Sequence, residues 1–264
     1  MGTPIFLKTP ISYYGGKQSM LQYILPLIPP HSVYCEPFAG GAAVFWAKEP
    51  VKSECLNDKN GFVTNFYVQL KTNFDALKRA VEATPYSRDI YKRAMTIYDV
   101  PHMFNPVERA WAFWVGTVQG FSNKIGSWRS NSLTGKENSM MNNKKLILTR
   151  ELASRLDFVQ IENKDACVLI SDMDSVDTFF YIDPPYVGSN QGHYAGYTQE
   201  HFNALLERLS GIKAKFLLSS FPNAELSKYV KKFGWQTKEI NMHKSISNAK
   251  NRRKIEVLTG NYLL

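Results

Sequence analysis

The chain has 264 residues, 44% of them hydrophobic, and its 32 basic and 23 acidic side chains give a formal net charge of +9. That composition is typical of a globular protein and excludes a disordered chain, and no apolar run approaches the roughly 18–20 residues that a membrane-spanning helix needs. We therefore expect one large domain, or a core domain with an insertion, and no membrane association.

Short strand-like runs alternate with helical stretches along most of the chain. Strands are predicted at 33–35, 53–56, 158–161, 178–182, 215–219, 235–241 and 256–262, and helices at 42–48, 60–70, 74–83, 200–210 and 223–231. The run at 178–182 is almost continuously apolar, as a strand buried on both faces should be. This alternation predicts an α/β fold, a largely parallel sheet with helices on both faces.

The middle of the chain departs from this alternation. Two helical pieces, at 89–98 and 107–118, are followed by a polar stretch over 119–145 that is rich in Gly, Ser and Asn. This pattern predicts a mainly helical insertion, with a hairpin or loop at its tip, over residues 66–148. Residues 1–65 and 149–264 would then form the core domain.

The distribution of charge indicates the kind of partner, and the cysteines indicate the cellular compartment. Residues 61–160 carry +6 and residues 201–264 carry +8, whereas residues 161–200 carry −6. Two basic regions indicate a polyanionic partner such as nucleic acid. Three widely spaced cysteines, scattered histidines and an N-terminus without an apolar signal segment predict a cytoplasmic protein with no disulfide framework and no metal.

The strongest chemical signal is Asp183-Pro184-Pro185-Tyr186, directly after the apolar strand at 178–182. Ligand sites in open α/β sheets lie at the carboxyl ends of strands. Two prolines stiffen the loop and leave its carbonyls free to accept hydrogen bonds. The Asp183 carboxylate, the Pro184 carbonyl and the Tyr186 ring are what an exocyclic amino group on a planar base requires. The structural alternative is a strand-ending turn with a packed tyrosine.

Three weaker signals precede it. Glu36-Pro37-Phe38-Ala39-Gly40-Gly41 forms a glycine turn after the first strand, where the backbone can approach a ligand. Asp58 ends the second strand, where an acid hydrogen-bonds ribose in nucleoside-binding folds or simply caps a helix. Tyr13-Tyr14-Gly15-Gly16-Lys17 lies before the first strand, and by itself it is equally consistent with a surface loop.

Together these motifs resemble those of the Dam-type DNA adenine methylases, the D12 class of S-adenosylmethionine-dependent N6-adenine methyltransferases. Residues 13–17 are similar to the family's Trp-Ala-Gly-Gly-Lys segment, and residues 36–41 match its Glu-Pro-Phe-x-Gly-Gly. Residues 57–60 fit its Asn-Asp-x-Asn pattern, and residues 183–186 match its catalytic tetrapeptide completely. The order of the motifs along the chain is also the family's order.

The resemblance implies a Rossmann-like S-adenosylmethionine-binding domain interrupted by a DNA target-recognition insertion, with S-adenosylhomocysteine as the product. It implies catalytic roles for Asp183, Pro184 and Tyr186. The residues expected to contact the cofactor are Tyr13, Lys17, Glu36, Pro37, Phe38, Ala39, Gly40, Asp58, Asp165 and Asp183.

The expected partner is double-stranded DNA. Basic groups on phosphate supply affinity, and base-edge contacts supply specificity. The candidates are Ser122, Asn123, Lys124, Trp128, Arg129 and Asn131 in the insertion, and Lys250, Arg252 and Arg253 near the C-terminus. Trp128 is either a wedge that fills the vacated base stack or a packed aromatic. We expect a monomer, encoded by a bacterium or a mobile element, that can be paired with a restriction endonuclease.

Three alternatives stay open. An N4-cytosine methyltransferase, or an enzyme that methylates a glutamine amide, needs the same acceptor site for a planar amino group. A non-catalytic DNA-binding module that kept the fold is the alternative from another class. Asp at position 183, an intact tetrapeptide and the match over the whole chain favour adenine methylation.

Overall fold

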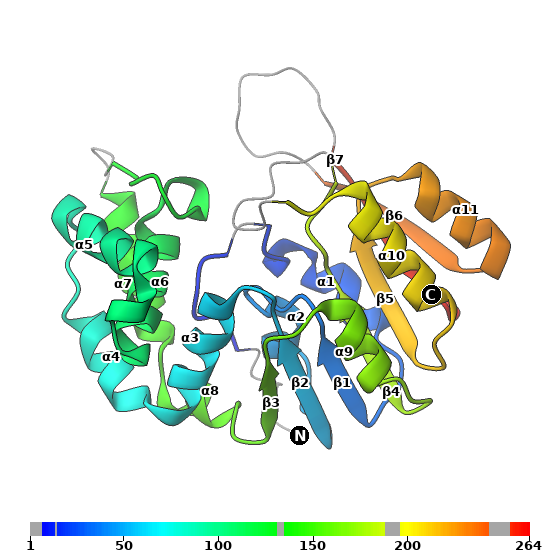
Figure 1. Cartoon of the computed structure of the whole chain (residues 1–264), viewed down its shortest axis with the longest axis horizontal. Coiled ribbons are helices and arrows are strands. Elements are labelled where there is room, and N and C mark those ends of the chain that lie inside the picture. Colours follow the sequence, from blue (N-terminus) through cyan, green and yellow to red (C-terminus); the bar gives the residue numbers. More distant parts are fainter. Residues whose placement is uncertain (1–6, 14, 131–134, 188–195, 243–253) are drawn as a thin grey trace.

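The computed structural model describes residues 7–13, 15–130, 135–187, 196–242 and 254–264. Its centre is a seven-stranded sheet in the order β3-β2-β1-β4-β5-β7-β6 (Figure 1). The strands are β1 Val33–Glu36, β2 Ser53–Asn57, β3 Val159–Glu162, β4 Thr178–Ile182, β5 Lys215–Ser220, β6 Gln236–Met242 and β7 Lys254–Gly260. Strands β1 to β5 pair in parallel, and β7 runs antiparallel to both β5 and β6.

Helices cover both faces of this sheet, so the predicted α/β class is confirmed (Figure 1). Side chains alternate between the faces of a strand, and the two faces belong to two separate hydrophobic clusters. Phe180 of β4 and Phe216 of β5 pack with α9 Ala166–Asp172, α10 Gln199–Ser210 and α11 Ala224–Phe233. Phe179 and Leu217 belong to the opposite cluster, with α1 Leu21–Ile24 and α2 Ala43–Ala47.

The connection between β2 and β3 contains a mainly helical insertion, as predicted. Its helices are α3 Gly61–Thr72, α4 Phe74–Glu82, α5 Arg88–Asp99, α6 Pro106–Gln119, α7 Lys136–Ile147 and α8 Arg150–Ser154. Most residues of α6 are buried, and α3, α4 and α5 all pack against it. Helix α3 also contacts β3, so it joins the helical part to the sheet. The predicted boundary at residues 65 and 66 lies inside this continuous helix.

The polar stretch after α6 contains a helix that the sequence pattern does not reveal, because residues 136–147 form α7. Only Met141 of this helix is buried, so its sequence has no clear apolar stripe. Tertiary contacts hold it instead: the Lys144 ammonium donates to the carbonyl of Thr9 at 2.7 Å and of Ile11 at 3.0 Å. The predicted hairpin is present before it, where Gly120 and Trp128 form an antiparallel bridge.

Short helices accompany the longer elements. They are the 3₁₀ turns Gln18–Met20, Leu25–Leu27, Pro101–Met103 and Phe121–Asn123. In the described part of the chain, no helix combines the length and the apolar character that crossing a membrane would require.

A buried carboxylate lies at the end of β1. Glu36 is 2% exposed, and it accepts hydrogen bonds from the Tyr34 hydroxyl at 2.8 Å and the Phe45 amide at 2.7 Å. Burial disfavours the charged form, and it raises the pKa of Glu36 to about 8 although both hydrogen bonds oppose the shift. The folded protein therefore keeps a proton at Glu36 that the unfolded chain loses at a much lower pH.

This difference makes the stability depend on pH. Between the ordinary carboxyl pKa of about 4.3 and about 8, the folded state binds more protons than the unfolded state, so the free energy of unfolding falls as pH rises. We expect Glu36→Gln to flatten this fall, because an amide retains an acceptor oxygen without a charge. Urea denaturation of the unmodified protein and of Glu36→Gln at pH 5 and pH 8 measures the fall in the free energy of unfolding. An equal fall in the two proteins would contradict the raised pKa of Glu36.

Candidate active site

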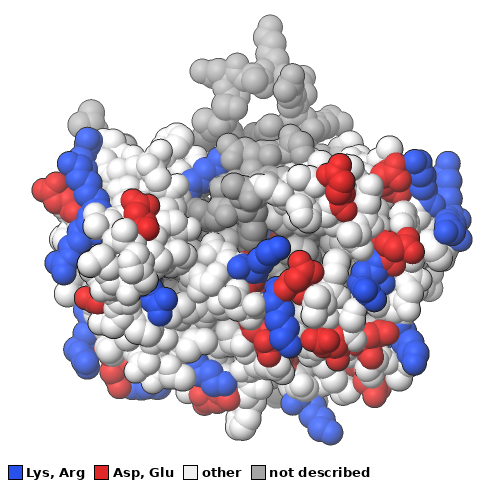
Figure 2. All heavy atoms as spheres, in the orientation of Figure 1, with Lys and Arg blue, Asp and Glu red and all other residues white. Residues whose placement is uncertain are grey.

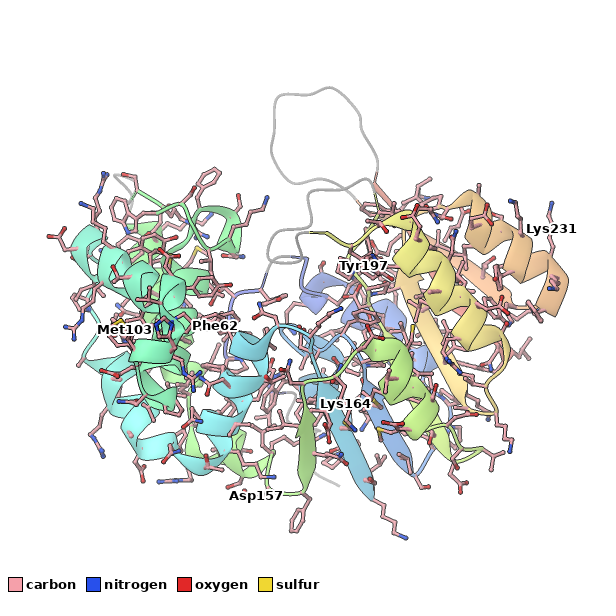
Figure 3. The ribbon with its side chains drawn as sticks, viewed as in Figure 1. Phe62, Met103, Asp157, Lys164, Tyr197 and Lys231 are labelled. Atoms are coloured by element: carbon pink, nitrogen blue, oxygen red, sulfur yellow. The ribbon has the colours of Figure 1, made fainter. Side chains whose placement is uncertain are left out.

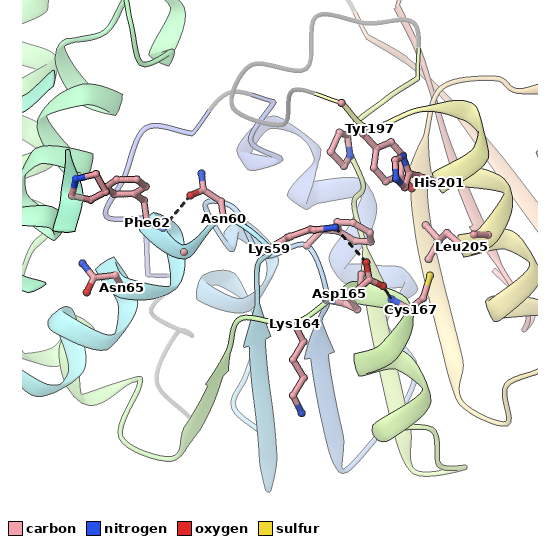
Figure 4. A pocket seen from close by; sticks show the side chains of 18 of the residues that line it. Lys59, Asn60, Phe62, Asn65, Lys164, Asp165, Cys167, Tyr197, His201 and Leu205 are labelled. Atoms are coloured by element: carbon pink, nitrogen blue, oxygen red, sulfur yellow. Dashed lines mark hydrogen bonds and ion pairs between the residues drawn. The ribbon is translucent and has the colours of Figure 1, made fainter. Parts of the chain in front are cut away.

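A cavity of about 900 Å³ opens at the carboxyl ends of the parallel strands, between the sheet and the helical insertion. The sheet order reverses between β1 and β4, which makes this edge the expected ligand site of an open α/β fold. Figure 4 shows residues of both parts lining it, with Phe62 and Asn65 on the insertion side and Asp165, Tyr197 and His201 on the sheet side.

The glycine turn forms one wall of the cavity. Gly40 has φ 46° and Ala42 has φ 49°, so the chain turns through the left-handed region before α2. The carboxylate of Asp58 holds this turn: it accepts from the Gly40 amide at 2.9 Å and from the Asn60 amide at 2.8 Å. Asp58 itself is fully buried, and Lys59 and Asn60 line the cavity beside it. Contact of Asp58 with a ribose therefore stays a prediction, whereas its support of the turn is direct.

Asn57 joins three strand ends, a role that the sequence analysis did not assign. Its amide nitrogen donates to the carbonyls of Pro37 at 2.8 Å and Lys164 at 3.1 Å, and its oxygen accepts from the Lys164 amide at 2.8 Å. The loops after β1 and β3 are thereby fixed to the end of β2. An asparagine at a strand's carboxyl end, next to an acid, was the available signal.

Aromatic rings and one carboxylate shape the sheet side of the cavity. Phe38 meets Tyr197 edge-on at 6.2 Å, and Tyr197 stacks on His201 at 5.6 Å. Asp165 caps α9 by accepting from the Cys167 amide, and its second oxygen lies 3.7 Å from the Lys59 ammonium. Aromatic surfaces beside an acceptor carboxylate suit a purine with an exocyclic amino group. Phe38, Pro37 and Asp165 thus line the cavity together with Tyr197 and His201, and their contact with a cofactor stays a prediction.

The predicted catalytic loop adjoins this cavity through Pro185. The Lys17 ammonium lies 2.8 Å from Oδ1 of Asp183, 3.6 Å from Oε1 of Glu256 and 4.8 Å from the centre of the Tyr186 ring. Burial raises the pKa of Asp183, and the Lys17 ammonium opposes that rise. Lys17, Asp183 and Tyr186 therefore form one cluster, although the first two are 166 positions apart in the sequence.

Tyr186 is held at its hydroxyl and at its edge. Its hydroxyl donates to Glu256 of β7 and lies 3.1 Å from the Ser219 hydroxyl of β5. Its ring meets Phe221 at 4.4 Å and 66°. The sequence analysis missed Glu256 and Ser219, because a carboxylate and a hydroxyl inside apolar strands carry no motif.

Tyr13, Glu36 and Ala39, which were also predicted to contact the cofactor, are not among the residues that line the cavity. Glu36 bonds within its own core, and the Ala39 amide donates to the carbonyl of Asn57 at 2.8 Å. Tyr13 packs against Phe113 at 6.4 Å. It also approaches the glycine turn, since a Cβ on Gly41 would lie 3.1 Å from that of Tyr13. These contacts shape the turn, and any contact with a ligand stays a prediction.

The hairpin of the insertion uses two of its predicted DNA-contact residues internally. The Arg129 guanidinium donates to the Gly120 carbonyl at 3.0 Å and to the Asn123 amide oxygen at 2.8 Å. Trp128 packs on Tyr86 at 5.8 Å and beneath Arg88 at 4.6 Å, so in this structure it is a packed aromatic rather than an exposed wedge. Ser122 has φ 53° and is exposed.

The other residues predicted to contact DNA lie partly in this hairpin and partly outside the described residues. Lys124 belongs to the same hairpin, whereas Asn131, Lys250, Arg252 and Arg253 lie outside the described residues. Among the described residues on the face in Figure 2, acidic side chains are interspersed with basic ones, and no single continuous basic patch forms there. Figure 3 places Phe62 and Met103 on the insertion and Lys164 and Tyr197 on the sheet side of the molecule.

Comparison with known proteins finds two methylases of similar sequence and one solved structure. The chain is 26% identical over 211 residues to the modification methylase StsI of Streptococcus sanguinis, covering 70% of this chain and 29% of that one. It is 26% identical over 214 residues to the type II methyltransferase M1.LlaDCHI of Lactococcus lactis subsp. cremoris, covering 72% and 69%. A solved structure of a candidate RNA methyltransferase from Pyrococcus horikoshii aligns over 98% of this chain and 87% of that one, at 12% identity and a TM-score of 0.37.

The family model for D12 class N6 adenine-specific DNA methyltransferases matches residues 13–257, from the first glycine motif to β7. That family is specific for adenine, so it favours adenine over the cytosine alternative. The chain belongs to the D12 class of N6 adenine-specific DNA methyltransferases.

Proposed function

We propose that this chain transfers a methyl group from S-adenosylmethionine to the N6 amino group of an adenine flipped out of double-stranded DNA. The observation that carries the proposal is the placement of Asp183 and Tyr186 at the end of β4, beside a cavity with an aromatic wall. In this proposal the catalytic part comprises residues 1–65 and 149–264 and residues 66–148 recognise the target, with α3 crossing the first boundary.

The cavity suits the adenosine portion of the cofactor. Its volume of about 900 Å³ is within the range of small-molecule sites. Phe38 and Tyr197 supply ring surfaces, and Asp165 supplies an acceptor for an exocyclic amino group. When bound, the cofactor supplies an electrophilic methyl group on a positively charged sulfur. The carboxylate of Asp183 favours a cation nearby, as its pairing with Lys17 illustrates.

Asp183 and Pro184 prepare the nucleophile. The amino nitrogen of adenine is a poor nucleophile, because its lone pair is delocalised into the ring. Hydrogen bonds from its two N–H groups to the Asp183 carboxylate and the Pro184 carbonyl draw it toward a pyramidal form, in which the lone pair is free to attack. Alignment of that lone pair supplies much of the rate acceleration. The methylated nitrogen carries a positive charge, so it is acidic, and after the transfer it loses a proton to the Asp183 carboxylate or to water.

Lys17 affects how Asp183 accepts the amino group of the base, because its ammonium already pairs with the Asp183 carboxylate. Its ammonium opposes the rise in the pKa of Asp183 that burial causes, and it thereby favours the charged carboxylate as an acceptor. With Lys17 at 2.8 Å from Oδ1, the amino group of the base approaches Oδ2.

The base must leave the duplex to reach Asp183, since its amino group is paired inside the helix. Stacking on the Tyr186 ring would return about 1–3 kcal/mol of the lost base stacking. The hairpin of the insertion and the C-terminal basic run supply the DNA contacts in this proposal. The modification methylases among its relatives extend the proposal to a paired restriction endonuclease.

Replacing Asp183 tests the chemistry. We expect Asp183→Ala to abolish transfer of labelled methyl groups to DNA, because the amino group loses its charged acceptor, while the DNA dissociation constant stays within about 3-fold, since specific DNA affinity rests mainly on phosphate and base contacts. Asp177→Ala is the matched control, as Asp177 is an exposed acid near the start of β4. Normal turnover by Asp183→Ala would refute the mechanism.

The DNA affinity should depend steeply on salt. Each phosphate that a Lys or Arg neutralises contributes a slope of about −0.9 to the plot of log binding constant against log salt. We expect a slope that reflects several such contacts, measured by fluorescence anisotropy with a labelled duplex between low and physiological salt. A DNA affinity that does not change with salt would show that the basic regions do not bind DNA phosphates.

A further inference from the structure

One carboxylate oxygen beneath the proposed catalytic loop accepts hydrogen bonds from two hydroxyls and lies within ion-pair distance of an ammonium. Glu256 of β7 is 2% exposed. Its Oε1 accepts from the Tyr186 hydroxyl and from the Ser219 hydroxyl at 2.8 Å, and it lies 3.6 Å from the Lys17 ammonium. The groups come from the first glycine motif, the β4 loop, β5 and β7, so the arrangement exists only in the folded chain.

A carboxylate is an expensive side chain to place at this position. Taking a charge out of water is unfavourable unless it is paired and hydrogen-bonded, and an apolar residue would fill the same space between strands. The partners of Glu256 therefore indicate that its function is to position the side chains of Tyr186, Ser219 and Lys17. All three reach the same oxygen, so that oxygen sets their positions relative to one another.

Two consequences follow for the site. The Tyr186 ring is fixed at its hydroxyl by Glu256 and at its edge by Phe221, so its exposed area cannot tilt freely. The Lys17 ammonium is shared between Asp183 and Glu256 instead of belonging to Asp183 alone. Without Glu256 the ring would lose its charged anchor, and Lys17 would occupy Asp183 more completely.

We propose that Glu256 is a positioning residue for methyl transfer, which holds the Tyr186 hydroxyl and thereby orients the ring on which the flipped base stacks. This proposal rests on the proposed function above. Glu256 touches neither the base nor the cofactor in it, and acts through Tyr186 and Lys17.

Steady-state methylation of DNA by a small set of variants tests the proposal. We expect Glu256→Ala to lower kcat about 10-fold or more, because small misplacement of reacting groups is costly, with KM for the cofactor within about 3-fold. Glu256→Gln should stay within about 3-fold of the unmodified protein, because an amide oxygen can accept the same two hydroxyls. Tyr186→Phe, which removes only the hydroxyl, should lower kcat like Glu256→Ala, and the two losses should not add.

Two matched controls separate positioning from stability. Tyr262→Phe removes a hydroxyl that donates to the Leu27 carbonyl at 2.7 Å, away from the cluster. Glu54→Gln alters another buried carboxylate, which pairs with Lys48 at 2.6 Å. Neither should change kcat, and thermal melting checks that every variant is folded.

The outcomes are distinguishable. Unchanged kcat in Glu256→Ala, or losses that multiply fully in the double variant, would overturn the role of Glu256 while leaving DNA methylation established. Unchanged kcat in Tyr186→Phe would overturn it even if no Glu256 variant folds. An unmodified protein that does not methylate DNA would instead overturn the proposed function, and with it the role that rests on it.

Discussion

The site depends on one buried cation. The Lys17 ammonium pairs with Asp183 at 2.8 Å, lies 3.6 Å from Glu256 and faces the Tyr186 ring. Two carboxylates so close together in a poorly solvated place repel each other. The ammonium between them offsets this repulsion and opposes the rise in the pKa of Asp183 that burial causes, which favours the charged Asp183 that the proposed chemistry requires.

The sheet brings these groups together by its topology. The chain reverses its strand order between β1 and β4, so the loops after both strands open into the same space. Asn57 then joins the loops after β1 and β3, and Asp58 holds the glycine turn through the Gly40 amide. The cavity wall is therefore built by backbone contacts of buried polar side chains, and the residues exposed to a ligand are their neighbours.

Much of this arrangement is predictable from the sequence, because its signals are local. The alternation of strands and helices predicts the sheet, and an apolar strand followed by Asp183-Pro184-Pro185-Tyr186 predicts the edge that carries the site. What escapes prediction is non-local. Helix α7 lacks an apolar stripe and depends on lysine contacts with distant carbonyls, and Glu256 becomes informative only when β7 inserts beside β5. The role of Arg129 in closing the hairpin through Asn123 also escapes prediction, and the predicted contact of Arg129 with DNA stays a prediction.

The central claim is that the amino group of adenine is the methyl acceptor. The most direct test incubates the unmodified protein with random-sequence duplex DNA and S-adenosylmethionine carrying a labelled methyl group, followed by nucleoside analysis and mapping of the modified positions. The account predicts N6-methyladenine at a defined sequence. Label in N4-methylcytosine, or no label in DNA at all, would contradict it.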